Sequence, residues 1–264
     1  RGYRNSPAQT AEAIDPDGLI DPHVFVLRID DQEGTPIASV AGYTMHPTTM
    51  GPSNRLISSD WPGYLKRTVE MITGVPCLFA QGATGNVGPG PDGFTDDVRV
   101  IRRIGGEVGC EAARVYLGLD AAAAKYRHEK VWESGAPLGK WTREPVSEPT
   151  AEVKVMSRTV HLPTIAQPPV DEAQARVDAA QERLDTLKAQ GAPAKEVEAA
   201  TFVVKRANMA RSRAETYGGM ATFPIEMHLL QIGPAVIVGT EGEPFAEIGL
   251  AVKAASPVAD TWFG

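Results

Sequence analysis

Apolar residues in the first half of the chain recur at two spacings, one typical of strands and one typical of helices. The apolar positions between 24 and 29 and the apolar run 37–45 flank a polar segment, and this pattern predicts a β-hairpin. Large apolar residues follow Asp60 at helical spacing, so we expect a helix with Ser59 or Asp60 as its N-cap. A short apolar strand over 75–80 and a helix from Asp96 or Asp97 to about Leu119 come next. Residues 1–22 are expected to be coil.

The second half begins with a segment rich in glycine and proline, 134–150, which predicts an exposed loop. A strand marked by spaced valines follows near His161. Residues 170–217 carry an apolar stripe at helical spacing that is broken at 191–193, and this predicts two antiparallel helices joined by a tight turn. An alternating strand over 225–232, a buried strand over 235–239 and a final helix to about Ala255 complete the chain.

These elements predict an α/β fold, with mixed β-sheets flanked by helices and an inserted antiparallel helical hairpin. We expect residues 1–264 to belong to one domain, within which 170–217 is an insertion. The hairpin is expected to pack on itself and on the main domain. The alternative is a lid or a contact between copies of the chain.

Composition and charge exclude several classes of function. A net charge of −7, with no basic stripe, argues against nucleic-acid binding. No apolar run approaches the length of a transmembrane segment. Cys77 and Cys110 lie in apolar or helical contexts, so two buried free thiols are expected rather than a disulfide.

Two polar residues stand at the ends of predicted strands, where functional side chains commonly gather. His46 ends the apolar run 37–45 and is followed by Pro47; taken alone, it fits a half-buried loop histidine as well as a ligand. Glu243 precedes Pro244, a favoured first helical residue, and its plain structural role would be helix capping. His23, His128 and His161 are interpreted as surface or core residues, and His228 is a weak candidate for reaching the site.

An ordered set of motifs resembles the neutral/alkaline (non-lysosomal) ceramidase family. The matches run from about residue 24 to 256 around a divergent middle. They are His46-Pro47-Thr48-Thr49-Met50, Asn54, Leu56-Ile57-Ser58-Ser59-Asp60, Gly63-Tyr64, Phe79-Ala80-Gln81, Gly85-Asn86-Val87 with Pro89, and Gly242-Glu243. The resemblance identifies the domain as a ceramidase-like catalytic domain.

The resemblance implies a catalytic zinc ion held by two histidines, a glutamate and a tyrosine. The family's His-Pro histidine corresponds to His46 and its Gly-Glu glutamate to Glu243, so both are expected to be catalytic metal ligands. Asp60 is expected to be a plain helix cap, a carboxylate that orients a zinc histidine, or both. The other two ligands are expected outside residues 1–264, so we interpret the chain as an internal piece of a longer polypeptide.

The function implied by the resemblance is a zinc-dependent hydrolase of an N-acyl amide that uses metal-activated water. Its substrate would be a small-molecule or lipid-like amide, and a secreted or periplasmic location is favoured. The glycine-dense turn over residues 82–90 is expected to hold an oxyanion through Gly82, Thr84, Gly85, Asn86 and Gly88.

Gly88 stands where the family carries a serine that is taken as essential, so a serine nucleophile is not expected. One alternative is a metal-dependent esterase or amidase that acts on a smaller substrate. The other is a non-catalytic family member that serves in binding or assembly, for example as a homo-oligomer through the helical hairpin.

Overall fold

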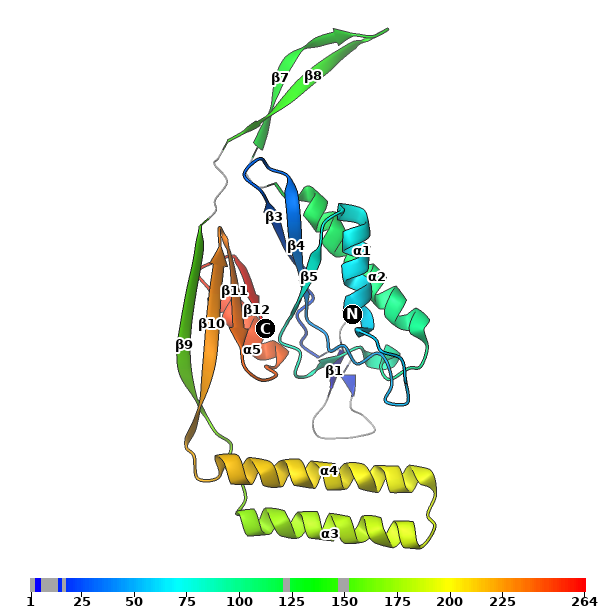
Figure 1. Ribbon diagram of the computed structural model, residues 1–264. Helices are drawn as coiled ribbons and strands as arrows, with labels where there is room; N and C mark the ends of the chain where they lie inside the picture. The colour runs from blue at the N-terminus through cyan, green and yellow to red at the C-terminus, as the bar shows by residue number, and fades with distance from the viewer. Residues whose placement is uncertain (1–2, 6–13, 16–17, 121–123, 147–151) are drawn as a thin grey trace. The chain divides into compact units, whose positions relative to one another are not determined.

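The computed structural model describes residues 3–5, 14–15, 18–120, 124–146 and 152–264. The chain divides into two units, residues 1–157 with 227–264 and residues 158–226, and each is described by itself. Strands and helices alternate along the chain, and the strands form several sheets with parallel and antiparallel pairs (Figure 1). The predicted α/β class with mixed sheets is therefore confirmed. The assignment of 1–264 to one catalytic domain with 170–217 inserted stays a prediction.

The first sheet of the larger unit has the strand order β3-β4-β5 and is built from the predicted hairpin and the strand after it. Strand β3 (Phe25–Asp30) pairs antiparallel with β4 (Pro36–Tyr43), and β4 pairs in parallel with β5 (Cys77–Gln81). The crossover between β4 and β5 contains helix α1 (Asp60–Thr73). Because β4 and β5 are parallel, their carboxyl ends lie at one edge of the sheet, and both chain segments that follow them begin there.

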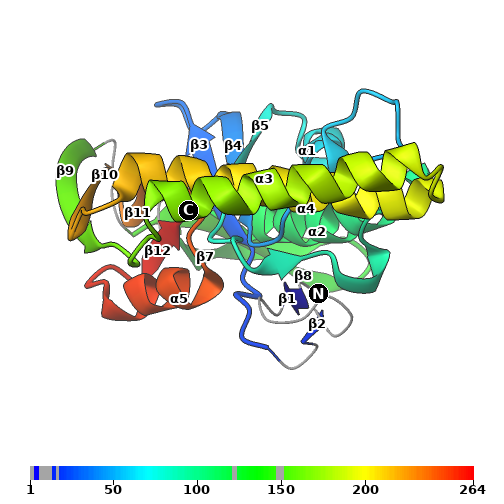
Figure 2. The ribbon, with the colours of Figure 1, turned by 90° about the horizontal axis from the view of Figure 1, so that it is seen from below.

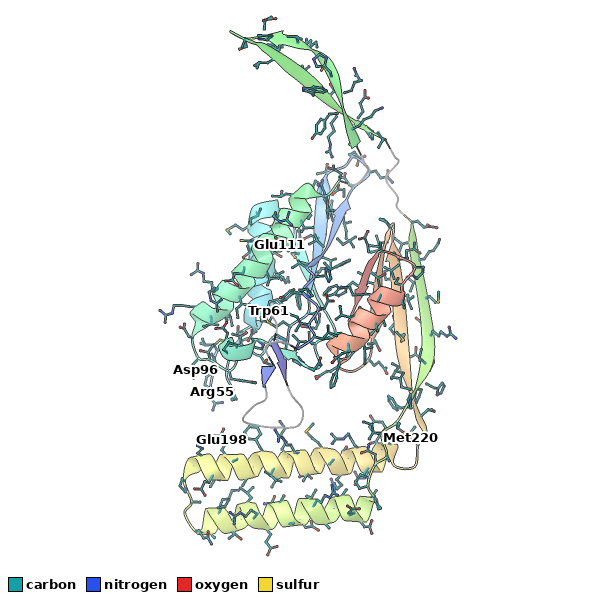
Figure 3. The ribbon with its side chains drawn as sticks, turned by 180° about the vertical axis from the view of Figure 1, so that it is seen from behind. Arg55, Trp61, Asp96, Glu111, Glu198 and Met220 are labelled. Atoms are coloured by element: carbon teal, nitrogen blue, oxygen red, sulfur yellow. The ribbon has the colours of Figure 1, made fainter. Side chains whose placement is uncertain are left out.

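Helices α1 and α2 (Val98–Gly118) enclose the main core together with this sheet. Trp61 (labelled in Figure 3) is fully buried there. It makes edge-to-face contacts with Tyr43 and Phe79, at ring-centroid distances of 5.9 and 5.2 Å. A Cβ on Gly105 would lie 2.3 Å from the Trp61 carbonyl oxygen, so this glycine permits the close packing of the two helices.

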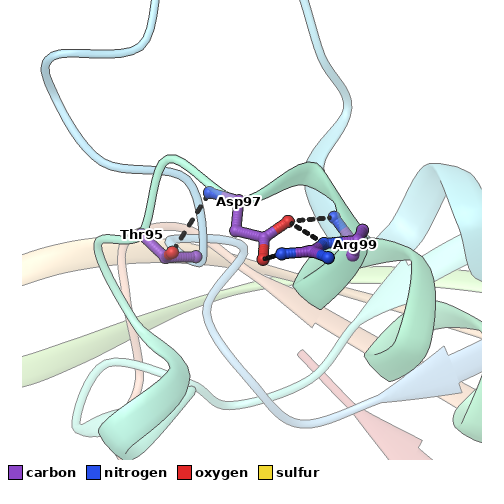
Figure 4. Close-up of polar contacts among 3 residues, drawn as sticks. All are labelled: Thr95, Asp97 and Arg99. Carbon is purple, nitrogen blue, oxygen red and sulfur yellow. Dashed lines mark hydrogen bonds and ion pairs between the residues drawn. The ribbon is translucent and has the colours of Figure 1, made fainter.

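Helix α2 begins as predicted, with Asp97 as its N-cap. The Asp97 carboxylate accepts hydrogen bonds from the backbone N–H and the guanidinium group of Arg99, and the Asp97 N–H donates to the Thr95 hydroxyl (Figure 4). These contacts fix the start of α2 directly after residues 93–96, which pair with the loop that follows His46.

The second sheet has the strand order β12-β11-β10-β9. Strand β10 (Thr222–Ile232) pairs antiparallel with β11 (Ala235–Thr240), and β11 pairs in parallel with β12 (Asp260–Phe263) across the helix α5 (Ala246–Ala255). Strand β12 was not among the predicted elements. Its last residues are buried and pack with β11 and α5, so tertiary contacts rather than a local pattern define it.

The expected loop over 134–150 is wrong for residues 137–145, and residues 147–150 lie outside the described residues. Strands β7 (Ala124–Glu133) and β8 (Pro137–Pro145) form a two-stranded antiparallel ribbon. Glycine and proline residues were interpreted as loop signals, but Pro137 and Pro145 lie at the two ends of β8, where no ladder hydrogen bond is lost.

The remaining corrections are small. Residues 1–22 contain two short strands, β1 (Tyr3–Asn5) and β2 (Ile14–Asp15), which form a sheet with β6 (Val87–Gly88) in the order β2-β1-β6. A 3₁₀ turn, η1 (Gly90–Asp92), follows β6. Cys77 is a buried free thiol as expected, but Cys110 is exposed on α2.

The second unit contains the predicted helical hairpin. Helix α3 (Val170–Ala189) and helix α4 (Ala194–Tyr217) lie side by side in both views (Figures 1 and 2). Leu184, Leu187 and Ala200 form their small shared core. The strand β9 (Val153–Pro163) leads into this unit, and β10 leads out of it.

Candidate functional site

His46 lies three residues after β4, and its main chain is held at both ends. Its N–H donates to the Val87 carbonyl oxygen at 2.9 Å, and its carbonyl oxygen accepts from the Trp61 indole Nε1 at 3.2 Å. The Nδ1 atom of the ring lies 2.5 Å from the Thr84 carbonyl oxygen. A carbonyl oxygen can only accept, so Nδ1 carries the proton and the lone pair of the neutral ring is on Nε2.

Glu243 is delivered by the loop between β11 and α5. Gly242 before it has φ +85°, a left-handed turn that glycine adopts without strain. The next residue, Pro244, accepts a hydrogen bond from the Gly85 N–H at 2.9 Å. Helix α5 begins at Ala246 with Phe245 as its N-cap, so the capping role considered for Glu243 is not observed.

His46 and Glu243 come together although 196 positions of sequence separate them, with Nε2 of His46 3.7 Å from Oε2 of Glu243. That distance is too long for a hydrogen bond. Two ligands of one tetrahedral zinc ion lie about 3.3 Å apart. The imidazole is largely buried and the carboxylate is 76% exposed, so a small movement of the glutamate alone would close the difference.

The glycine-dense turn makes hydrogen bonds both to His46 and to the loop that carries Glu243. The Thr84 carbonyl oxygen accepts from both His46 and the Val87 N–H, and the Gly85 N–H donates to Pro244. The buried Asn86 side chain accepts from the Ala246 N–H and donates to Glu247, each at 2.9 Å. The turn therefore fixes the relative position of the loops that carry His46 and Glu243.

The residues of the expected oxyanion site make hydrogen bonds of their own in this structure, and their oxyanion role stays a prediction. The Gly82 N–H donates a hydrogen bond to the Tyr43 carbonyl oxygen, and the Gly85 N–H donates one to the Pro244 carbonyl oxygen. In this conformation both N–H groups are therefore engaged within the chain. The Asn86 amide is likewise engaged with α5. Gly88 lies in β6, opposite Tyr3 of β1.

Asp60 is buried and has φ +55°, an uncommon conformation for a residue other than glycine. Its carboxylate accepts from the Met50 N–H at 2.8 Å and from the Trp61 N–H at 2.7 Å. Asp60 is the first residue of α1 and Ser59 is the N-cap, so of the two expected caps the structure has Ser59. The carboxylate anchors the loop that follows His46, whereas the His46 ring is held by Thr84. Its role in metal binding stays a prediction.

Three of the other histidines make ring contacts with residues away from His46 and Glu243. The His23 ring contacts Asp21, the His128 ring contacts Trp141, and His228 Nδ1 lies 2.8 Å from the Ser157 hydroxyl. Sequence reasoning missed Asn86 as the connector and Thr84 as the partner of the His46 ring. A polar residue within the Gly85-Asn86-Val87 turn was visible, but its partner on α5 is 160 positions away.

Two curated relatives match one part of the chain. Neutral ceramidase B of Dictyostelium discoideum is 31% identical over 102 residues, which cover 35% of this chain and 14% of the relative. Neutral ceramidase A of the same organism is 32% identical over 89 residues, which cover 34% of this chain and 11% of that relative. No family model matches the chain.

Over about a third of its length, the chain is thus similar in sequence to neutral ceramidases. A solved structure, a ceramidase complexed with C2, is similar in fold, with a TM-score of 0.50 at 19% identity over 99% of this chain and 44% of that chain. The matches span only 14% and 11% of the length of these curated relatives.

A cavity of about 520 Å³ lies beside the loop that follows His46. It is lined mainly by apolar residues of this loop, α1 and α2, with Arg67 and two serines among them. His46 and Glu243 are not lining residues, but Met50 is, and Met50 is fixed by Asp60.

Within the described residues, no group of three or more histidine, cysteine, aspartate or glutamate side chains is placed to hold a metal ion. The expected role of His46 and Glu243 as metal ligands stays a prediction. None of the helices in the described part of the chain has the length and hydropathy needed to cross a bilayer.

Proposed function

We propose that this chain contributes to a zinc-dependent hydrolase of an N-acyl amide such as ceramide. The observation that carries the proposal is the 3.7 Å approach of His46 Nε2 and Glu243 Oε2, with the proton of the imidazole held on the opposite nitrogen. The names of the curated relatives, both neutral ceramidases, support the same class of reaction.

The chemistry of the two side chains fits zinc. Neutral imidazole and carboxylate are common zinc ligands in hydrolases, and a histidine ligand typically donates its other ring N–H to a carbonyl or carboxylate. The hydrogen bond from His46 Nδ1 to Thr84 meets this requirement. When bound, zinc would supply a Lewis acid and a water of lowered pKa. The family resemblance implies two further ligands in addition to His46 and Glu243.

The residues of the chain prepare this site in three ways. Thr84 keeps the Nε2 lone pair available, Asn86 and Gly85 fix the Glu243 loop, and Trp61 and Val87 fix the His46 main chain. Since these contacts are made before any ligand arrives, little reorganisation is needed on binding.

The proposed substrate is amphiphilic. The cavity beside Met50 would accept the aliphatic chain of an N-acyl amide, and its Arg67 and serine side chains would contact polar groups. An aliphatic chain in this cavity is the feature that would distinguish a lipid-like amide from a smaller substrate.

The test combines metal content with hydrolysis. The intact protein, with the two further ligands that the resemblance implies, should contain about one zinc ion per chain by inductively coupled plasma mass spectrometry. It should hydrolyse ceramide in a screen of N-acyl amides and esters, and a chelator should abolish this activity. A protein that binds no zinc and hydrolyses equally well with chelator present would refute the proposal.

Gly88 favours a second candidate, a family member that binds its ligand without cleaving it. The hydroxyl expected from the family at this position is absent. If zinc and ceramide bind but no hydrolysis is detected, this candidate is preferred. Gly88→Ser would then be expected to restore measurable ceramide hydrolysis.

A further inference from the structure

The β7–β8 ribbon has no core of its own. Nearly every residue of its two strands is exposed, and these include Tyr126, Trp132, Leu138 and Trp141. An isolated two-stranded hairpin is at best marginally stable in water, and large aromatic side chains rarely remain exposed without a binding role. We propose that the tip of this ribbon inserts into the interface of an anionic lipid surface.

The apolar residues are concentrated at the tip. Trp132 lies directly opposite Leu138, and the next pair toward the base is Val131 with Gly139. Trp132, Leu138 and Val131 are 56, 54 and 52% exposed. Tryptophan is favoured at membrane interfaces because its ring is apolar and its N–H is polar.

Two lysines lie directly behind this apolar tip. Lys130 and Lys140 are cross-strand neighbours, an unfavourable pairing of like charges in water. Glu129 neutralises Lys140 at 2.9 Å, while Lys130 extends over the Trp132 ring at 5.6 Å. With its five basic and three acidic residues, the ribbon carries a net charge of +2 in a chain of −7.

The spacing matches the depth of a lipid interface. A strand rises about 3.3 Å per residue, so Trp132 lies about 7 Å beyond Lys130. Interfacial segments bury their apolar groups about 5–10 Å below the headgroups. The tip would therefore reach the acyl boundary while the lysines remain at the level of lipid phosphates. Glu133, opposite Pro137, limits the insertion to the interface.

The charge distribution argues for lipid over a second copy of the chain. A two-fold contact places the same surface on both partners, so the lysines would face one another. Phosphate headgroups provide the opposite charge.

Binding is measured with the whole chain and vesicles of phosphatidylcholine, with or without phosphatidylglycerol. All four tryptophans are described; Trp61 and Trp262 are buried, so a blue shift of the emission on binding would report Trp132 and Trp141. We expect a blue shift and co-sedimentation with the phosphatidylglycerol vesicles, both weakened by salt.

Two variants test the apolar tip and the pair of lysines separately. Trp132→Ala and the double variant Lys130→Glu, Lys140→Glu should each bind the anionic vesicles about tenfold more weakly. Phe202→Ala and the double variant Lys195→Glu, Lys205→Glu, which alter exposed residues of α4, are matched controls and should bind like the unaltered chain. Unchanged circular dichroism would show that the variants fold.

No vesicle binding by the unaltered chain would overturn the proposal, as would equal binding by the ribbon variants and the controls. Concentration-dependent self-association that Trp132→Ala abolishes, without vesicle binding, would instead assign the ribbon to a second copy. The binding assay needs no turnover, so its outcome is independent of the proposed hydrolase function.

Discussion

Gly85 lies so close to the backbone of Glu243 that a Cβ on Gly85 would come within 2.3 Å of the Glu243 carbonyl oxygen. The Phe245 ring, at 2.8 Å, leaves no space on the other side. The loop that carries the glutamate can therefore approach the turn that holds His46 only because residue 85 has no side chain.

The first prediction concerns this approach. Gly85→Ala should displace the Glu243 loop, weaken zinc binding at least about tenfold and cost about 1–3 kcal/mol of unfolding free energy. Zinc affinity by competition with a chromophoric chelator and urea denaturation would measure the two effects. Gly106→Ala is the matched control, since a Cβ on this helical glycine meets nothing within 4 Å, and it should stabilise α2 by about 0.5–1 kcal/mol. Equal zinc affinity in the two variants would contradict the prediction.

The second prediction tests the ligands. His46→Ala and Glu243→Ala should each reduce zinc from about one ion per chain to a small fraction, because each removes one donor atom. His161→Ala and Glu241→Ala alter exposed residues of the same types and should retain the metal. Retention of full metal and full hydrolysis by His46→Ala would show that the assignment of His46 is wrong.

The third prediction concerns Asn86. Replacement by alanine leaves the buried N–H of Ala246 without its acceptor and removes the donor to Glu247. We expect a loss of about 2–4 kcal/mol in unfolding free energy, measured by urea denaturation. Asn208→Ala, which removes one hydrogen bond within α4, should change stability by about 0.5 kcal/mol or less. Comparable losses in both variants would argue against a connecting role for Asn86.

The fourth prediction concerns acid stability. Burial of the Asp21 carboxyl opposes its ionisation, but hydrogen bonds from Lys253 and His23 outweigh burial and lower its pKa below the usual 3.8. A lowered pKa in the folded state stabilises the protein above about pH 3.8, and this contribution is lost as the pH falls through the lowered value.

Lys253→Met keeps most of the packing on Trp262 but removes the partner of Asp21. It should cost about 3 kcal/mol at pH 7, since a buried carboxylate loses its cation, and the cost should diminish below about pH 3.8. Denaturation midpoints of both proteins from pH 7 to pH 3 would measure it. A difference that does not change with pH would mean that Lys253 acts through packing alone.

The local pattern of the sequence was sufficient for most helices and for the strands of both main sheets other than β12. Trp61, Tyr64 and Leu65 recur at helical spacing, and the break at Gly191 separates α3 from α4 in the structure. Each of these signals arises within a few residues, because helix and strand periodicity reflects which face of one element is buried. The family motifs likewise singled out His46 and Glu243.

Only the tertiary structure decided what those residues contact. The partners of His46 are Thr84 and Glu243, and the partner of Asn86 is Ala246, all contacts between distant segments. The same holds for β12, which exists through its pairing with β11, and for β8, whose prolines suggested a loop. Hydrogen bonds between distant segments depend on how sheets and helices stack, and one sequence read locally contains no measure of that stacking.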